Sequence, residues 1–428
     1  MPNMFKLSVI SSTLLISQFA LAAPDNSIIV NQASADETKV VTQNNQTTID
    51  IAPANNHGVS YNSYDAFNVD KKGLTFNNQT ADAGMIINEV VSDQKSFLNG
   101  NMSVDGKKAH LVIANPNGIS CNGCGITGAK QLTLTAGKIA LSQDGALLGY
   151  YDNSGSIRIN NTDGNSFSSV NKLNIIAENI TIRNSQIKTA DLTTFAGHEL
   201  VKFTPGTVRG LEAIPGKDSA EKSKLSISKN SRINADNMYV SANNAVIKNH
   251  GQIEVGPVGD AKTQKYMNSH LTMDLVNSEL TNGSNGNIHA AAANSILENS
   301  AITNNGTFKI DNTHKIMAIG NAVINNKSNM SSDMTDVTGL QNVVSGVGIN
   351  NSGNLSGSLS VKANTIALNN KKYLEALDIS TNSNVLAYIN NGEIMNETAK
   401  FKAYELYHSG NGKITSRPVF EAEIKNPL

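Results

Sequence analysis

Short apolar runs alternate with asparagine-, glycine- and aspartate-rich corners along almost the whole chain after residue 35. One such unit runs from Lys172 to Ala177 and leads into Ile180–Asn184; similar units follow at 225–228 and 359–362. The runs have the length and composition of strands, and apolar residues at helical spacing are almost absent. The pattern predicts an all-β protein.

A second repeated unit ends in a glycine turn, at 249–253, 304–308, 390–394 and 410–414. Gly353, Gly392 and Gly412 are separated by 39 and 20 residues, which corresponds to two turns and one turn of a coil of about 20 residues. Repeats of this length are typical of solenoids, in which each turn buries its apolar face on its neighbours. We therefore expect one elongated body.

Residue composition indicates which solenoid this is. The chain has 59 asparagines against 33 glycines, and it shows neither the fixed leucines of leucine-rich repeats nor helical periodicity. Asparagines at equivalent corners can stack and hydrogen-bond from coil to coil. The sequence thus predicts a right-handed parallel β-helix, a single-stranded solenoid. Three polar stretches, 206–224, 256–268 and 329–339, are predicted to be loops that leave the coil.

Charge excludes one class of partner. The chain has 34 basic and 35 acidic residues, and its basic pairs, Lys71-Lys72 and Lys371-Lys372, are isolated. A nucleic-acid groove needs a denser positive surface, so no nucleic-acid partner is expected. Nothing in the sequence indicates a cofactor, and we expect none.

The N-terminus has the features of an export signal. Lys6 gives a weakly basic start, Leu7–Phe19 is apolar, and Ala20-Leu21-Ala22 is a small-residue cleavage site. The apolar part is too short for a permanent anchor. The sequence predicts a signal peptide over residues 1–22, export from the cytoplasm, and no permanent membrane span.

The only two cysteines are Cys121 and Cys124. In an exported protein this pair favours a disulfide over a redox centre, and the second cysteine or histidine pair that zinc requires is missing. We therefore predict a Cys121–Cys124 disulfide and no metal site. A loop this short stabilises the fold by at most about 2 kcal/mol in the chain-entropy model.

The most distinctive segment of the chain is the bend over residues 115–125. Pro116 fixes its own φ and pushes Asn115 toward extended conformations, while Asn117-Gly118 tolerates positive φ. The apolar run at 109–114 therefore cannot continue straight into the next strand. We expect this bend to display something specific.

Several segments, in order, resemble the secretion domain of two-partner-secretion exoproteins, the filamentous haemagglutinin, haemolysin and contact-dependent-inhibition group. The similarity covers about residues 35–205. The matching segments are Gly58–Val69, Ile87–Ser92, Ser96–Gly100, the bend at 115–125 and Leu192–Gly197.

The resemblance implies a β-helix with an N-terminal β cap and hairpins outside the helix, read by a dedicated β-barrel transporter in the outer membrane of a Gram-negative bacterium. Asn115, Pro116, Asn117 and Gly118 fall on the family's secretion motif, and we expect all four to be exposed at a turn. The implied organisation is a secretion domain over 23–205 followed by a β-helical rod with loop excursions over 206–428. Export would pass through the periplasm to the cell surface or the medium.

The chain departs from the family in two respects. An earlier Asn-Pro motif would fall near Phe76–Gln79, where no proline stands, and no Val-Glu-Asn-Asn boundary or toxin-like domain follows. The Cys-x-x-Cys is typical of the haemolysin and contact-dependent-inhibition branches.

The expected function is that of a surface adhesin that binds a receptor on a host or neighbouring cell. The alternatives are a haemolysin or cytolysin and a truncated contact-dependent-inhibition exoprotein. A β-helical carbohydrate-active enzyme is disfavoured because the carboxylates are scattered, whereas glycosidases need two that converge. His198-Glu199 and His250 are expected to be solvated corner residues.

Overall fold

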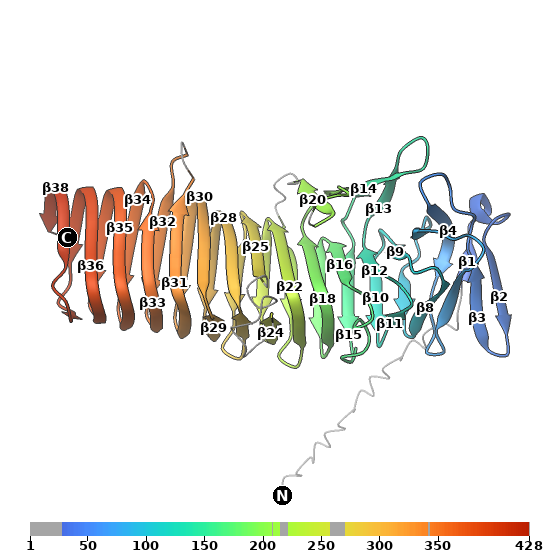
Figure 1. Cartoon of the computed structure of the whole chain (residues 1–428), viewed down its shortest axis with the longest axis horizontal. Helices are drawn as coiled ribbons and strands as arrows, with labels where there is room; N and C mark the ends of the chain where they lie inside the picture. Colours follow the sequence, from blue (N-terminus) through green and yellow to red (C-terminus); the bar gives the residue numbers. More distant parts are fainter. Residues whose placement is uncertain (1–27, 208, 215–220, 257–269, 341–342, 428) are drawn as a thin grey trace, which may run out of the picture.

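Twenty-nine strands form one continuous sheet that winds into a rod (Figure 1). The computed structural model describes residues 28–207, 209–214, 221–256, 270–340 and 343–427. The predicted signal peptide lies outside the described residues. Between residues 28 and 196 the sheet contains β1 (Ile28–Val30), β4 (Val59–Phe67), β6 (Met85–Val90), β7 (Ser96–Leu98), β9 (His110–Ala114), β10 (Ile119–Asn122), β12 (Gln131–Thr135), β15 (Ser156–Asn160), β16 (Lys172–Ala177), β17 (Asn179–Arg183) and β18 (Gln186–Ala196).

The sheet continues through eighteen further strands after residue 222. These are β21 (Ser223–Ile227), β22 (Arg232–Asn243), β23 (Ala245–Asn249), β24 (Gln252–Val255), β25 (His270–Val276), β26 (Glu279–Asn282), β27 (Asn287–Ala290), β28 (Ala292–Asn304), β29 (Thr307–Ile310), β30 (Thr313–Asn326), β31 (Asn329–Gly339), β32 (Gly346–Asn351), β33 (Asn354–Lys362), β34 (Thr365–Asn370), β35 (Tyr373–Asn390), β36 (Glu393–Ser409), β37 (Lys413–Ile414) and β38 (Val419–Pro427).

Parallel pairing in register stacks each coil on the one before. Ile302 of β28 pairs with Ile324 of β30, which pairs with Ile349 of β32, and all three are buried. Alternate residues of these strands point inward, so the apolar runs form one core cluster inside the coil from Ile49 to Leu406. The predicted parallel β-helix is confirmed.

The N-terminal end of the rod is closed by a β cap. A five-stranded sheet contains β2 (Lys39–Gln43), β3 (Gln46–Asp50), β5 (Leu74–Asn78), β8 (Asn101–Gly106) and β11 (Gly125–Thr127). Its outermost pair, β2 and β3, is antiparallel, and a single 3-10 turn, η1 (Gln32–Ser34), leads into it. Antiparallel pairing at the first coil covers an edge that would otherwise be open to another chain.

An antiparallel sheet lies outside the coil near β9 and β16 (Figure 1). It contains β13 (Lys138–Leu141), β14 (Leu147–Tyr151), β19 (Leu200–Phe203) and β20 (Leu211–Ile214). Below it lies a second apolar cluster, in which Tyr150 and Val201 of this outer sheet pack on Phe195 of the coil. The expected hairpins outside the helix are therefore present.

Asparagines stack in the interior of the rod after residue 248. Each donates from Nδ2 to the Oδ1 of the next at 2.8–3.0 Å, and all are buried. This inner ladder consists of Asn249, Asn282, Asn304, Asn326, Asn351, Asn370 and Asn390. The spacing of 19–25 residues from Asn282 onward is one coil, as the glycine repeats predicted.

Glycines follow the ladder because neighbouring coils approach closely there. A Cβ on Gly353 or Gly392 would lie 2.1 or 2.2 Å from the carbonyl oxygen of Ser328 or Lys372 in the coil before. No side chain fits at that distance, which explains the glycine turn of the repeat.

The three predicted loop excursions have different outcomes. Within the first, residues 206–207 and 209–214 do leave the coil, because they lead into β20 of the outer sheet. The prediction is wrong for Ser223 and Lys224, which already belong to strand β21 of the coil. The prediction for 329–339 is wrong: Asn329–Gly339 is strand β31 of the coil, with Met330 and Val337 buried. The stretch 257–268 lies outside the described residues.

Candidate functional site

The bend between β9 and β10 is built around the side chain of Asn115. Asn115 Oδ1 accepts from the backbone N–H of Asn117 at 2.9 Å, which closes an Asx-turn. Its Nδ2 donates to Gln94 O and Ser96 Oγ, both at 2.9 Å, so the turn is tied to the preceding coil. All hydrogen-bonding groups of this amide are therefore used inside the protein.

The expectation that the whole motif is exposed is wrong. Asn115 is 0% exposed and Gly118 is also buried, while Pro116 is half-buried and Asn117 is exposed. Asn117 lies at the apex of the turn, where its Nδ2 donates to Ser92 O at 2.7 Å. Thus the buried Asn115 and Gly118 fix the conformation of the corner, and Pro116 and Asn117 form its accessible surface.

Glycine is required at position 118 by both conformation and space. Its φ is 103°, and a Cβ would lie 2.7 Å from Ser156 O in the next coil. The Lys95 side chain passes over the same position, with its Cε 3.5 Å from where that Cβ would be. Burial lowers the pKa of Lys95, and the nearby Arg158 lowers it further.

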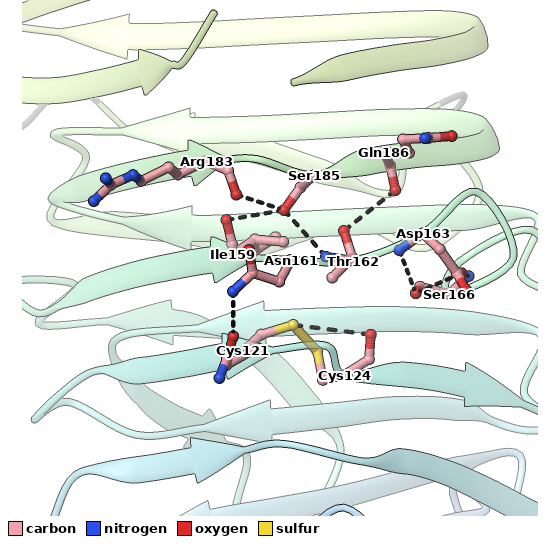
Figure 2. The surroundings of a disulfide bond; sticks show 11 residues. Cys121, Cys124, Ile159, Asn161, Thr162, Asp163, Ser166, Arg183, Ser185 and Gln186 are labelled. Carbon is pink, nitrogen blue, oxygen red and sulfur yellow. Dashed lines mark hydrogen bonds between the residues drawn. A yellow bond between two sulfur atoms is a disulfide. The ribbon is translucent and has the colours of Figure 1, made fainter. Parts of the chain in front are cut away.

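A disulfide joins Cys121 and Cys124 directly after the corner (Figure 2), with the Cα atoms 5.2 Å apart and both residues fully buried. Between them Asn122 turns outward, and its Oδ1 accepts from Asn161 Nδ2 at 2.8 Å. Asn161 in turn accepts from Asn184 at 2.8 Å. The disulfide thus lies at the start of a short asparagine ladder on the outside of the rod.

Sequence reasoning missed a buried carboxylate that fastens the outer sheet to the coil. Tyr61 Oη donates to Glu89 Oε2 at 2.6 Å, and the backbone N–H of Ile139 in β13 donates to Oε1 at 2.9 Å. Burial raises the pKa of Glu89, and it outweighs these two hydrogen bonds, which lower that pKa. An acid between the apolar pairs Ile86-Ile87 and Val90-Val91 was the signal for such a role.

His198 and His250 differ in burial. The expectation that His198 is solvated is wrong, since it is 4% exposed and its Nε2 contacts Ser241 Oγ at 2.9 Å. His250 is half-buried. Within the part of the chain that the structure describes, no three His, Cys, Asp or Glu residues are grouped to hold a metal ion. Nor does any described helix have the length and apolar character needed to cross a membrane.

Comparisons with known proteins locate this region within a family. The TPS secretion domain model matches residues 20–255, more than half of the chain. The solved filamentous hemagglutinin secretion domain superposes with a TM-score of 0.50 at 21% identity, covering 65% of this chain and 94% of that one. This likeness supports the fold.

Two curated relatives align with parts of the chain. A tRNA nuclease CdiA of Yersinia mollaretii is 38% identical over 178 residues, which cover 37% of this chain and 6% of that protein. A hemolysin of Proteus mirabilis is 33% identical over 220 residues, 45% of this chain and 13% of that protein. The alignments therefore span only a small part of either relative.

The β-helix, its β cap and the family match lead to one conclusion. The chain belongs to the TPS secretion domain family, whose members are exoproteins that Gram-negative bacteria secrete across the outer membrane with the help of a partner transporter in that membrane.

Proposed function

We propose that the chain is a non-enzymatic exoprotein that docks on its transporter through the corner Asn115–Gly118 and then acts outside the cell as an adhesin. The observation that carries the docking role is that two residues of this corner are buried and two are accessible. A buried amide fixes the turn, so Pro116 and Asn117 are held at its apex without further ordering on binding. Such preorganisation lowers the entropic cost of association.

Secretion assays in the presence of the cognate transporter test the docking role. Asn117→Ala removes the exposed amide, and we expect at least a tenfold drop in secreted protein with little change in stability. Asn101→Ala is the matched control, because Asn101 is also exposed and donates one side-chain hydrogen bond, to Thr127 Oγ1 at 3.1 Å. Equal secretion of the two variants would remove the docking role.

Asn115→Ala separates docking from folding. It leaves buried partners unsatisfied, so it is expected to lower both stability and secretion. Asn304→Ala, a buried ladder asparagine far from the corner, controls for stability alone. If both variants lose secretion equally at equal loss of stability, Asn115 acts only through the fold.

The rod supports the adhesin role. The stacking continues across residue 205, because β18 pairs with β22, and it extends to β38 with outward positions that are largely polar. The proposed division is a docking region over 23–205 and a presenting rod over 206–428. Purified protein should bind epithelial monolayers saturably; absence of binding would contradict the adhesin role.

Lysis is the second candidate function. The Cys121–Cys124 pair and the 33% identity to a hemolysin favour it. Haemoglobin release from red cells that are incubated with the purified protein would establish lysis, and binding without release would support adhesion. A truncated inhibition exoprotein would instead inhibit neighbouring bacteria in co-culture.

A further inference from the structure

Four stacked strands carry a patch of cations on their outward face. β15, β17, β21 and β23 pair in parallel, one above the next. Each contributes one exposed cation, and these are Arg158, Arg183, Lys224 and Lys248. In Figure 2 the Arg183 side chain extends away from the hydrogen-bonded residues around it. We call these four residues the cationic face.

Acidic residues are absent from the outward positions of these four strands. The other outward residues are Ser156, Asn160, Asn179, Thr181, Ser226 and Val246. The next strand of the stack, β26, brings the first carboxylate, Glu279, and half-buried Glu178 precedes β17. Because the whole chain has 34 basic and 35 acidic residues, this separation of charge is local.

None of the four cations forms an ion pair with a described residue. Described lysines and arginines elsewhere do so, for example Arg232 with Glu254 at 2.6 Å and Lys138 with Asp152 at 2.8 Å. Lys95 adds a further cation near the corner at 115–118, where it lies close to Gly118 and Arg158. The charge of this face is therefore available to a partner.

The geometry of the face indicates the shape of that partner. Arg158 and Lys248 lie at the same register position, three strands apart, whereas Arg183 lies two residues beyond that position and Lys224 two residues before it. Since neighbouring strands lie about 4.8 Å apart and a residue adds about 3.3 Å along a strand, the patch spans roughly 15 Å across the strands and about 13 Å along them. A patch of this kind on an open sheet presents its charges to a surface, not to a ligand enclosed by a pocket. Phosphate groups of an anionic lipid layer have the complementary charge and likewise lie spread over a surface.

We propose that the cationic face binds the phosphate-bearing surface of an anionic lipid membrane. The family membership shown above means that the exported chain crosses the outer membrane, so a lipid surface is within reach when this part folds. Attraction of this kind would keep the front of the rod beside the membrane. The inference is independent of the docking role of Asn115–Gly118.

Sedimentation with lipid vesicles tests this proposal. The purified chain is mixed with phosphatidylcholine vesicles that either contain or lack 30 mol% phosphatidylglycerol (a composition on the order of biological anionic surfaces). We expect retention on the anionic vesicles only, and release at high salt because screening shortens the range of the attraction.

Charge-neutral variants assign the binding to the face. The test variant carries Arg158→Gln, Arg183→Gln, Lys224→Gln and Lys248→Gln, and it should bind on the order of tenfold more weakly or worse. The control carries Lys327→Gln, Lys362→Gln, Lys371→Gln and Lys372→Gln. These four lysines are exposed on the rod, and their replacement changes net charge equally. The control should bind like the parent.

Three outcomes would overturn the proposal. Equal loss in both variants would mean that net charge alone drives binding, and equal retention on neutral vesicles would mean that the phosphates are not recognised. No retention on vesicles together with tight binding to a soluble polyanion such as DNA would assign the face to another class of partner. Unfolding curves are measured for the parent and both variants. If the curves coincide, differences in vesicle binding do not arise from differences in stability.

Discussion

The front of the rod, residues 28–214, and the part after residue 222 build the same coil but stabilise it differently. The front adds layers outside the coil: a β cap, an outer antiparallel sheet over its own apolar cluster, and a disulfide. The later part repeats one device inside the coil, the asparagine ladder from Asn249 to Asn390. Because the added layers stabilise the front from outside, its successive corners can differ, and one of them can be the corner at 115–118. The ladder, in contrast, requires an asparagine at the same place in each coil, so successive coils must be alike.

The largest expected effect comes from the apolar cluster below the outer sheet. Phe195→Ala would empty a fully buried site beside Tyr239, whose ring centre lies 5.7 Å away, and should cost about 4 kcal/mol of unfolding free energy. Met317 in the later part is 43% exposed, and Met317→Ala should change stability by less than about 0.5 kcal/mol. Urea unfolding measures both, and similar costs would contradict the role given to the outer sheet.

The second-largest loss of stability is expected from the asparagine ladder. Asn304→Ala removes bonds to Asn282, Asn326 and two backbone groups, which leaves buried groups unsatisfied, and should cost about 3 kcal/mol. Asn350 donates to Asn325 at 3.0 Å on the exposed side of the coil, so Asn350→Ala should cost less than about 1 kcal/mol. If Asn304→Ala lowered the unfolding free energy no more than Asn350→Ala, the ladder would not stabilise the rod.

Acid should weaken both regions through buried histidines. Burial lowers the pKa of His110 and His198 in the front, and of His314 in the later part, to about 4. The unfolded chain therefore takes up protons first, so stability is complete above pH 6.5 and is lost as pH falls toward 4, by about 2 kcal/mol per histidine at pH 4.5.

The pH effect can be assigned to one histidine. His314 Nε2 lies 2.8 Å from Ser295 Oγ, so His314→Phe combined with Ser295→Ala removes both polar partners. The double variant should lose less stability than the parent between pH 7 and pH 4.5 in urea titrations. An unchanged pH dependence would exclude His314 as a contributor.

The disulfide should have the smallest effect. Replacing both Cys121 and Cys124 by serine opens a loop so short that the cost should not exceed about 2 kcal/mol. Secretion should persist, because the hydrogen bonds that hold Asn115 and Asn117 in the corner involve neither cysteine. A collapse of the whole coil in thermal melts would show that the disulfide holds more than its own corner.

The repetitive part of the fold could be predicted from the sequence because the same asparagine and glycine residues recur at its corners. The glycine turns at 304–308 and 390–394 predicted the coil length, and the close approach at Gly392 explains why they recur. Asn329–Gly339 was mistaken for a loop because it has few apolar residues: Met330 and Val337 point inward, and apart from Met334 its outward residues are polar or glycine. A strand with polar outward residues resembles a loop when its stacking partners are unknown.

The front was harder to predict because its contacts join distant segments. β14 pairs with β19, about fifty residues later, and no local pattern reports that pairing. The corner residues were identified correctly as a turn, but their match to the secretion motif suggested that Asn115 would be exposed. Its amide is instead fully bonded inside the protein, a use of asparagine that composition cannot distinguish from a solvated one.

Site-specific crosslinking in secreting cells tests most directly whether the corner meets the transporter. A photoreactive residue placed at Asn117 should give an adduct with the outer-membrane transporter. The same residue at Asn350, exposed on the later part of the rod, should give far less. No adduct from position 117, or equal adducts from both positions, would contradict the account.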